Sequence, residues 1–589
     1  MAFHCDHLLI PNTRLNMHDQ VGHVASSGAS TKHPKARRSA NYRPNIWDHK
    51  FVQSLSSDFK CGIHADRVEK LKKDVRGMFA EASGSESSLE LIDTIQRLGL
   101  DYHFPGEIKS ALDTIFMESH NIYHDYQDDL SIRALRFRLL RQHGYEVCQD
   151  VFKRFKEESY KNDRMDVQGM LSLYETSFYA CEDEEILNQI QEFTTRHLMD
   201  YMNEGNDDDK IHSRLGNIRH EISHSLELPS LWRVPRMEVR WCIEMYQMKQ
   251  DIAPSLLEFA KLDFNMVQAT YQEDLKYASR WGRDMGLDEI LSFARNRLAE
   301  CFFWCTGLKS EPKFGNMRRQ LTQVGYLVAI IDDVYDVYGS LEELKLFTEA
   351  VERWDINTVE NLPQYLKICF LALYNTVNGM GYEILKKDAL DVIPYLKKTW
   401  AEFCKALLVE ATWYYSEYMP TLEEYTKNGS ISVAGPLVSL HAHCLSGDYE
   451  ITKEALECMD NNQHSDVTYW ASVIFRLAND LGTSKDEVER GDAPSSIQCY
   501  MHQTGVSECI AREHIKHLIS LSWKKMNNTL SSRSGYLPSS FMINTAQNLA
   551  RTSLYMYQHG DGFSIPHRET KHRIASIIVE PIPVEGIAI

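Results

Sequence analysis

The sequence predicts an all-α protein made of two helical domains. Apolar residues recur every three or four positions through most of the chain, as at Val68, Leu71, Val75 and Met78. This spacing is typical of one buried helix face. Alternating apolar and polar residues, which would predict strands, are rare. The chain has 589 residues, which is long enough for two domains of ordinary size.

The composition disfavours several classes of partner. A formal net charge of -19 argues against nucleic acids and anionic membranes. The mean hydropathy is -0.40 and no long apolar run occurs, so we expect no membrane span. The 13 cysteines lack paired Cys-x-x-Cys spacings and are expected to be free thiols, with Cys301 and Cys305 in the core. We expect a monomer.

Residues 1–36 lack a sustained apolar period and are expected to form a disordered leader. The leader is short and contains Asp6 and Asp19, whereas plastid transit peptides are poor in acidic residues. We therefore favour a cytosolic location, with the plastid as the alternative.

Two prolines predict the boundary between the domains. Pro229 and Pro235 interrupt the helical pattern. We expect an N-terminal helical domain over residues 37–232 and a C-terminal metal-binding, catalytic domain over residues 233–589.

Three aspartates form the first candidate metal site. Asp332, Asp333 and Asp336 follow an apolar run, and in a helix Asp332 and Asp336 would project from one face. Carboxylates in this arrangement can bind Mg²⁺ while leaving room for a phosphate-bearing ligand. The alternative is a solvated helix end before Gly339.

A second polar element lies further along the chain. Asn479, Thr483 and Glu487 are four residues apart and would place amide, hydroxyl and carboxylate oxygens on one helix face. They could form the polar face of an exposed helix. If the two elements face each other across a bundle, they could instead hold Mg²⁺ ions against a diphosphate.

On these motifs the chain from Arg37 onward resembles a plant class I terpene synthase of the monoterpene-synthase-like subfamily. Arg37, Arg38 and Trp47 fit the RRx8W element of that subfamily. The acidic segment fits its DDxxD motif, and the second element fits its second metal motif. The resemblance implies a prenyl diphosphate substrate and Mg²⁺, with Mn²⁺ as the alternative metal. The implied metal ligands are Asp332, Asp333, Asp336, Asn479, Thr483 and Glu487.

The same resemblance implies donors for the diphosphate. Arg295 and Arg297 fit the family's RxR element, with Asn296 where Asp is usual. Arg476 is expected to add a further guanidinium that holds the diphosphate after it leaves.

Loss of diphosphate would leave an allylic carbocation, which needs shielding from water and can be stabilised by aromatic faces. The resemblance places Trp304, Phe475 and Tyr557 in this pocket, with Asp561 close by. For each aromatic residue, the alternative is ordinary core packing. A proton is expected to be lost to the diphosphate or near Tyr557.

Other activities can be compared with this one. The Asn/Thr/Glu type of second motif disfavours a chain-elongating prenyltransferase. Because no Asp-x-Asp-Asp acid occurs, the N-terminal domain is expected to be a non-catalytic relic α-barrel. The non-enzyme alternative is a helical binding protein that kept the fold and lost turnover.

The substrate depends on the depth of the pocket. Gly325, seven residues before Asp332, leaves open a position where a bulky aromatic residue would shorten the pocket as in isoprene synthases. Segments such as 491–496 and 561–563 resemble α-farnesene and β-ocimene synthases. We therefore expect farnesyl or geranyl diphosphate to give an acyclic olefin. The alternative product is a cyclic monoterpene or a terpene alcohol of the linalool, nerolidol or terpineol type.

Overall fold

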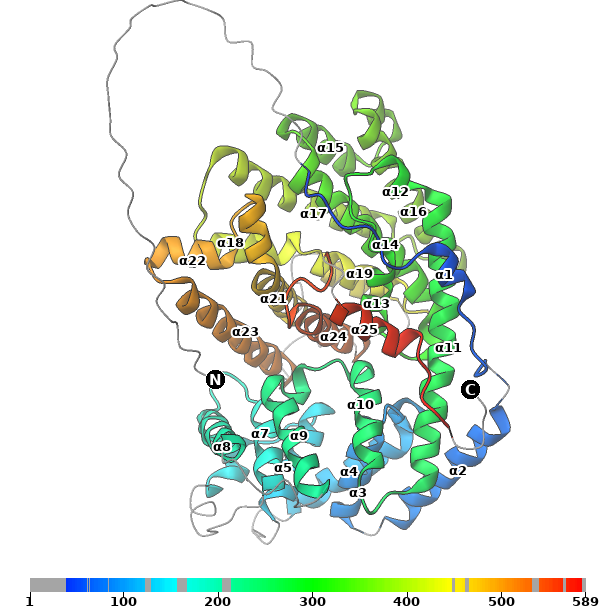
Figure 1. Ribbon diagram of the computed structural model, residues 1–589, viewed down its shortest axis with the longest axis vertical. Coiled ribbons are helices and arrows are strands. Elements are labelled where there is room, and N and C mark those ends of the chain that lie inside the picture. Colours follow the sequence, from blue (N-terminus) through cyan, green and yellow to red (C-terminus); the bar gives the residue numbers. More distant parts are fainter. Residues whose placement is uncertain are drawn as a thin grey trace, which may run out of the picture.

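The computed structural model describes residues 39–584, except 61, 63, 83, 122–128, 156–166, 204–212, 448–450, 461–465, 532–539 and 565–567. Within this part every regular element is a helix, so the all-α prediction is confirmed (Figure 1). The predicted leader and the pair Arg37 and Arg38 lie outside the described residues.

Most helices of the N-terminal half lie together in the lower part of Figure 1, whereas α1 (His49–Ser54) lies higher, beside the long helix α11 (Pro254–Met285). The longer helices of this half are α2 (Ala65–Glu81), α3 (Ser85–Arg97), α4 (Pro105–Asn121), α5 (Leu130–Gln142), α7 (Val167–Ser177), α8 (Glu185–Asn203), α9 (Ser213–Glu227) and α10 (Pro235–Gln247). The short turn η3 (Ser230–Trp232) precedes α10.

The C-terminal half lies above it and consists of helices that range from 4 residues (α12) to 32 residues (α11). These are α11 (Pro254–Met285), α12 (Leu287–Ile290), α13 (Leu298–Leu308), α14 (Gly315–Asp333), α15 (Leu341–Arg353), α16 (Gln364–Asp388), α17 (Ile393–Ser416), α18 (Leu422–Ser432), α19 (Gly435–Cys444), α20 (Lys453–Asp460), α21 (Asp466–Arg490), α22 (Ser496–Thr504), α23 (Glu508–Ser531), α24 (Ser540–Tyr557) and α25 (Arg568–Ile578).

Local sequence signals set the helix ends. Ser340 and Glu343 form a capping box that starts α15, because each side chain accepts a hydrogen bond from the other's backbone N–H. Helix α11 begins at Pro254, which needs no donor there, and ends before Gly286 at φ 60°. These signals match the residues at which the helices start and stop.

The two halves share apolar cores. One core combines Trp47 and Leu71 from the N-terminal half with Phe302 and Ile577 from the C-terminal half. Helix α10 packs against α3 as well as α11 and α13. The boundary at residue 232 coincides with η3 and stays a prediction, since the packing is continuous across it.

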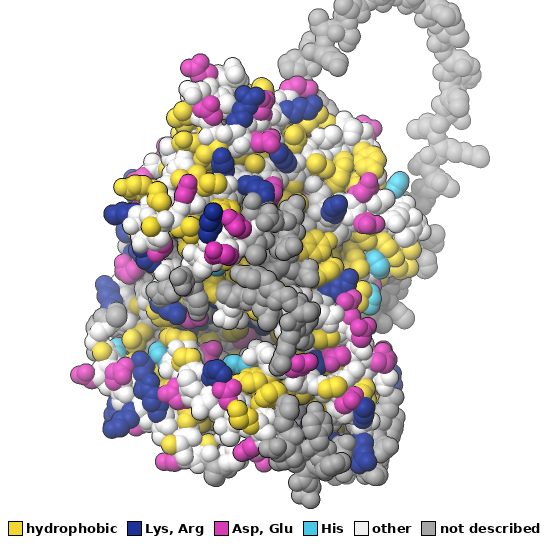
Figure 2. All heavy atoms as spheres, turned by 180° about the vertical axis from the view of Figure 1, so that it is seen from behind, with side chains coloured by type: hydrophobic (Ala, Val, Ile, Leu, Met, Phe, Trp, Pro, Cys, Tyr) yellow, Lys and Arg dark blue, Asp and Glu magenta, His cyan; other side chains and the backbone are white. Residues whose placement is uncertain are grey.

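Among the described helices, none is long and apolar enough to cross a membrane. On the face shown in Figure 2, basic and acidic side chains are interspersed over the described surface.

Candidate active site

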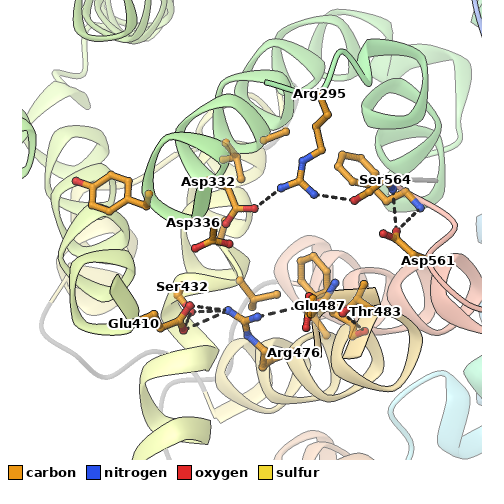
Figure 3. Close-up of a pocket in the computed structure, with 18 of the residues that line it drawn as sticks. Arg295, Asp332, Asp336, Glu410, Ser432, Arg476, Thr483, Glu487, Asp561 and Ser564 are labelled. Carbon is orange, nitrogen blue, oxygen red and sulfur yellow. Dashed lines mark hydrogen bonds and ion pairs between the residues drawn. The ribbon is translucent and has the colours of Figure 1, made fainter. Parts of the chain in front are cut away.

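A pocket with a volume of about 200 Å³ lies among α13, α14, α17, α21 and α24 of the C-terminal half. Its polar end is drawn in Figure 3. The lining includes most of the predicted site residues, namely Arg295, Trp304, Gly325, Asp332, Asp336, Phe475, Arg476, Asn479, Thr483, Glu487 and Tyr557.

The first acidic row lies where α14 ends. A single π-helical turn (Val334–Tyr338) follows α14, and Asp332 and Asp336 both line the pocket. Such wider turns often occur at functional sites. Asp333 is fully buried and lies outside the pocket lining. It accepts a hydrogen bond from the backbone N–H of Arg295 at 2.7 Å, so it holds the Arg295 loop.

Asp333 was predicted to be a metal ligand, but its carboxylate does not line the pocket. Its carboxylate is occupied by Arg295, whose Nε lies 3.1 Å from it, and by the hydroxyl of Tyr42. With no surface on the pocket, it supports the site from behind rather than facing a ligand.

The second row lies on α21, across the pocket from the first (Figure 3). Asn479, Thr483 and Glu487 all line the pocket, as their spacing predicts. The hydroxyl of Thr483 donates to the backbone carbonyl of Asn479 at 2.9 Å, which leaves its lone pairs available. Asp480, the next residue after Asn479, is buried instead and accepts from Tyr425 and from the backbone N–H of Ser496.

Two arginines flank the polar end. Arg295 forms an ion pair with Asp332 and donates from Nη1 to Ser564 Oγ at 2.7 Å. Arg476 on α21 donates from Nη2 to Ser432 Oγ at 2.7 Å and lies 3.3 Å from Glu410 of α17. Their donors are thus fixed on opposite sides of the pocket (Figure 3).

Arg297 was predicted to bind the diphosphate, but the structure places its side chain away from the pocket. It is fully buried and does not line the pocket. Its Nη2 donates to the carbonyls of Arg43 and Ser564, at 2.8 and 2.7 Å, and its Nη1 donates to the carbonyl of Asn296 at 2.9 Å. Because these carbonyls occupy its N–H donors, Arg297 links the segment around Arg43 to the loop around Ser564 and does not reach a ligand.

The apolar end of the pocket is walled by aromatic rings and small residues. The rings of Trp304 and Phe475 are 4.7 Å apart, and Tyr557 lies 6.5 Å from Trp304. A Cβ atom at Gly325 would lie 3.5 Å from Cys301 Cβ, in ordinary contact. Gly325 therefore widens the pocket, and a large side chain there would enter the cavity.

The acids around the pocket repel one another. Enclosure by the pocket walls, and then the charges of Asp332 and Glu410, raise the pKa of Asp336 well above its usual range. Burial, followed by the charge of Asp480, raises the pKa of Glu487 to about 8. Such crowding is relieved by a cation.

The donor set fits divalent cations bound together with a phosphate ligand. Its ligands are hard oxygen atoms on two opposite walls. No three His, Cys, Asp or Glu side chains among the described residues converge on one point. Mg²⁺ is commonly held by one or two carboxylates together with substrate phosphates, so a closed protein cage is not needed.

Several pocket residues were missed from the sequence, among them Glu410 and Tyr42. Glu410 is a single acid inside the apolar segment from Leu407 to Ala411, and this isolation could have indicated a site. Tyr42 comes from the extended N-terminal segment, and its ring lies 5.3 Å from the Arg295 guanidinium. Nothing in its local sequence points to that position.

Two family models match the chain. "Terpene synthase, N-terminal domain" covers residues 46–226, and "Terpene synthase family, metal binding domain" covers residues 283–525. Together they match more than half of the sequence. The chain belongs to the terpene synthase family. The resemblance seen in the motifs is thus confirmed, and this synthase is a lyase that acts on prenyl diphosphates.

Similar relatives are plant enzymes. The synthase is 50% identical over 554 residues to terpene synthase 10 of Ricinus communis, covering 93% of this chain and 98% of that protein. It is 49% identical to (-)-alpha-terpineol synthase of Vitis vinifera, over 93% and 91% of the two chains. It is 47% identical to the chloroplastic myrcene synthase of Quercus ilex, over 95% and 92%. These names place the synthase with the monoterpene type.

Solved structures agree with this assignment. A limonene synthase with 2-fluorolinalyl diphosphate has a TM-score of 0.87 and 40% identity, covering 93% of this chain and all of that one. Isoprene synthase from grey poplar, in complex with three Mg²⁺ ions and dimethylallyl-S-thiolodiphosphate, has a TM-score of 0.80 and 41% identity, over 92% and 100%.

Proposed function

We propose that this synthase ionises geranyl diphosphate with Mg²⁺ and releases a cyclic monoterpene or a terpene alcohol of the α-terpineol type. The observation that carries the proposal is a pocket with oxygen ligands and arginines at one end and an aromatic wall at the other. The likeness to the α-terpineol synthase supports a ten-carbon substrate. Mg²⁺ is supported by the metal-binding family model and by the complex of the related isoprene synthase.

In this proposal the residues of the polar end hold the substrate. Asp332 and Asp336 on one wall, and Asn479, Thr483 and Glu487 on the other, hold the metal ions. The bound metal would neutralise the diphosphate and make it a better leaving group. Arg295 and Arg476 donate to the diphosphate oxygens and keep the released anion in place.

The apolar end controls the carbocation. Trp304 and Phe475 present ring faces that stabilise positive charge and limit the access of water. An olefin forms when the cation loses a proton, whereas an alcohol forms when one water molecule adds to the cation and the adduct loses a proton. Buried at the end of α24, Tyr557 can remain a neutral proton donor or acceptor, because burial raises the pKa of its phenol. A proton lost from the cation can pass to the diphosphate or toward Tyr557 and Asp561.

The test is incubation of the purified synthase with geranyl or farnesyl diphosphate and Mg²⁺, followed by gas chromatography with mass spectrometry. We expect geranyl diphosphate to be turned over faster, with cyclic or hydroxylated ten-carbon products predominating. Turnover of farnesyl diphosphate alone would contradict the proposal.

A second candidate is an acyclic olefin, as expected from the sequence. It is favoured by the likeness to the myrcene synthase, whose product is acyclic. The assignment to α-farnesene or β-ocimene has no support among these relatives. A product mixture dominated by an acyclic ten-carbon olefin would select this second candidate.

Pocket depth gives an independent check on the substrate. Gly325→Phe should place a ring in the cavity, because Gly325 lines the pocket and a Cβ atom added there would already be in ordinary contact with Cys301. We expect turnover of geranyl diphosphate to fall by roughly tenfold or more, with a smaller loss for dimethylallyl diphosphate. Gly379→Phe, on α16 and outside the pocket lining, is the control. Equal losses for both substrates would show that Gly325 does not set the depth.

For the compartment we propose the plastid. The sequence favoured the cytosol because of Asp6 and Asp19, but relatives such as the myrcene synthase of Quercus ilex are named chloroplastic. A fluorescent protein fused to the C-terminus of the full chain should accumulate in plastids of leaf cells. Diffuse cytosolic fluorescence would contradict this proposal.

A further inference from the structure

A second cavity lies in the N-terminal half, on the other side of α24 from the catalytic pocket. Its volume is about 590 Å³, and α3, α5, α7 and α10 contribute to its lining. Leu549 and Tyr557 of α24 line the catalytic pocket, whereas Arg551 of the same helix lines the second cavity. The motifs of the synthase assign no role to this space.

Arg551 carries a charge that no acid balances. Its Nε donates to the carbonyl of Leu231 at 2.7 Å and its Nη1 to Asn548 Oδ1 at 2.9 Å. Among the described residues, Nη2 has no hydrogen-bond partner and no carboxylate pairs with the guanidinium. Burial lowers the pKa of Arg551, but a guanidinium does not lose its proton in a protein. A partly buried, unpaired charge is costly, so an anion here would be stabilising.

Tyr179 adds a second unused donor. The residue lines the cavity and is 8% exposed. Its hydroxyl has no hydrogen-bond partner among the described residues, and the charges of both Arg551 and Arg138 act on it. A buried phenol normally finds a partner, so this hydroxyl is available for a ligand.

The nearby charges favour a monoanion. Arg138 and Arg97 share one carboxylate, that of Asp93, at 2.7 and 2.9 Å. Glu175 accepts hydrogen bonds from the backbone N–H and the hydroxyl of Ser230. Arg97 and Arg138 are thus paired with a carboxylate, whereas Arg551 is an arginine of the same lining that no carboxylate pairs with among the described residues.

The remaining lining limits the ligand further. Elsewhere the cavity is lined by acids such as Glu221 and Glu238, which would repel a second negative charge. Apolar side chains also line it and can cover the body of an organic ligand. They are Leu98, Ile132, Leu135, Leu171, Trp241 and Met245.

We propose that this cavity binds an organic monocarboxylate, with its carboxylate held by Arg551 Nη2 and the Tyr179 hydroxyl and its apolar body against the surrounding apolar side chains. The arginine supplies a charge-assisted hydrogen bond and the phenol a second donor. The site is independent of the metal and of the proposed prenyl diphosphate chemistry.

The test is thermal unfolding of the full-length synthase with benzoate, benzyl alcohol or phenyl phosphate at equal millimolar concentrations. Mg²⁺ and diphosphate are present to fill the catalytic pocket. We expect benzoate to raise the Tm, and benzyl alcohol and phenyl phosphate to raise it less. An equal effect of benzyl alcohol would contradict the need for a charge, and a larger effect of phenyl phosphate would contradict the monoanion.

Three variants locate the effect. Tyr179→Phe should weaken benzoate binding by roughly tenfold, as expected for a lost hydrogen bond to a charged group. Arg551→Gln should abolish the Tm shift, while Arg196→Gln, an exposed arginine of α8, should keep it. An unchanged Tm shift in Tyr179→Phe overturns the proposal even if Arg551→Gln fails to fold.

A crystal soaked in bromide gives a second test. It should show an anomalous peak beside Arg551, and a peak only at Arg295 or Arg476 would contradict the site.

Discussion

At the scale of single residues, the last turn of α21 shows how position separates an acid that lines the pocket from one that is solvated. Glu487 lines the pocket, and burial and neighbouring acids raise its pKa to about 8. Glu489, two residues later, is exposed. The two carboxylates are chemically alike, so a difference between their variants reports on the pocket.

Glu487→Gln should lower kcat by on the order of 100-fold, because one metal ligand contributes several kcal/mol to charge stabilisation. The concentration of Mg²⁺ needed for half-maximal rate should also rise. Steady-state kinetics with geranyl diphosphate at varied Mg²⁺ would measure both effects. Glu489→Gln serves as the control and should behave as the wild type. Equal kinetics for the two variants would remove Glu487 from the ligand set.

Glu300 on α13 provides a pH-dependent effect on stability. The residue is 1% exposed and neither carboxyl oxygen has a hydrogen-bond partner among the described residues. Burial raises its pKa from 4.5 to about 7, although the charge of Arg297 opposes the shift. Between these two values the native state keeps a proton that the unfolded chain has lost. The free energy of unfolding therefore falls as the pH rises through this range.

Glu300→Gln cannot ionise and should remove this dependence. Relative to the wild type, the variant should gain up to about 3 kcal/mol in free energy of unfolding between pH 4.5 and pH 7. Urea denaturation at several pH values would measure the difference. The exposed Glu289→Gln, on α12, is the matched control and should track the wild type. A constant difference between Glu300→Gln and wild type at every pH would contradict the raised pKa.

At the scale of elements, periodicity predicted most of the helices and the two rows of polar side chains that line the pocket. Spacing alone placed Asn479, Thr483 and Glu487 on one face, because α21 is a regular helix throughout. It could not place Asp333, which needs the three-dimensional position of Arg295. Nor could it place Arg297, because the carbonyls of Arg43 and Ser564 that occupy its donors are distant in sequence.

The segment that Arg297 holds gives a prediction at this scale. Arg297→Lys keeps the charge but offers one ammonium where the guanidinium serves three carbonyls. The segment around Arg43 should loosen, and Tyr42, which lines the pocket, should move with it. We expect a severalfold faster proteolytic cleavage in this segment and a larger share of hydroxylated products, since water enters more easily.

The control for this change is Arg240→Lys. Arg240 also donates to backbone carbonyls, those of Ser576 and Glu580, but unlike the segments that Arg297 holds, this segment contributes no residue to the pocket lining. Limited proteolysis followed by mass spectrometry, together with the product ratio, would test the comparison. If both variants alter the products equally, the effect belongs to general destabilisation and not to the segment that covers the pocket.

At the scale of the whole molecule, the fold carries an electrostatic cost at its active site. The chain has a net charge of -19, and acids from α14, α17 and α21 converge on one pocket. The shared apolar cores of the two halves must offset this repulsion. A ligand that neutralises the pocket should therefore stabilise the entire molecule.

Metal removal tests this coupling. In the absence of metal, Glu487 has a pKa of about 8 against 4.5 in its ordinary state, so the native state binds more protons than the unfolded chain between these values. Its contribution to stability is lost as the pH rises through this range. Metal binding requires the carboxylate form and relieves the repulsion, so Mg²⁺ with diphosphate should raise the Tm more at pH 8 than at pH 6. Calorimetry with EDTA, or with Mg²⁺ and diphosphate, at both pH values would measure the two shifts. In Glu487→Gln, the metal-induced rise in Tm should differ less between pH 6 and pH 8 than in the wild type. If the wild type shows the same metal-induced rise in Tm at both pH values, these acids do not limit the stability of the metal-free fold.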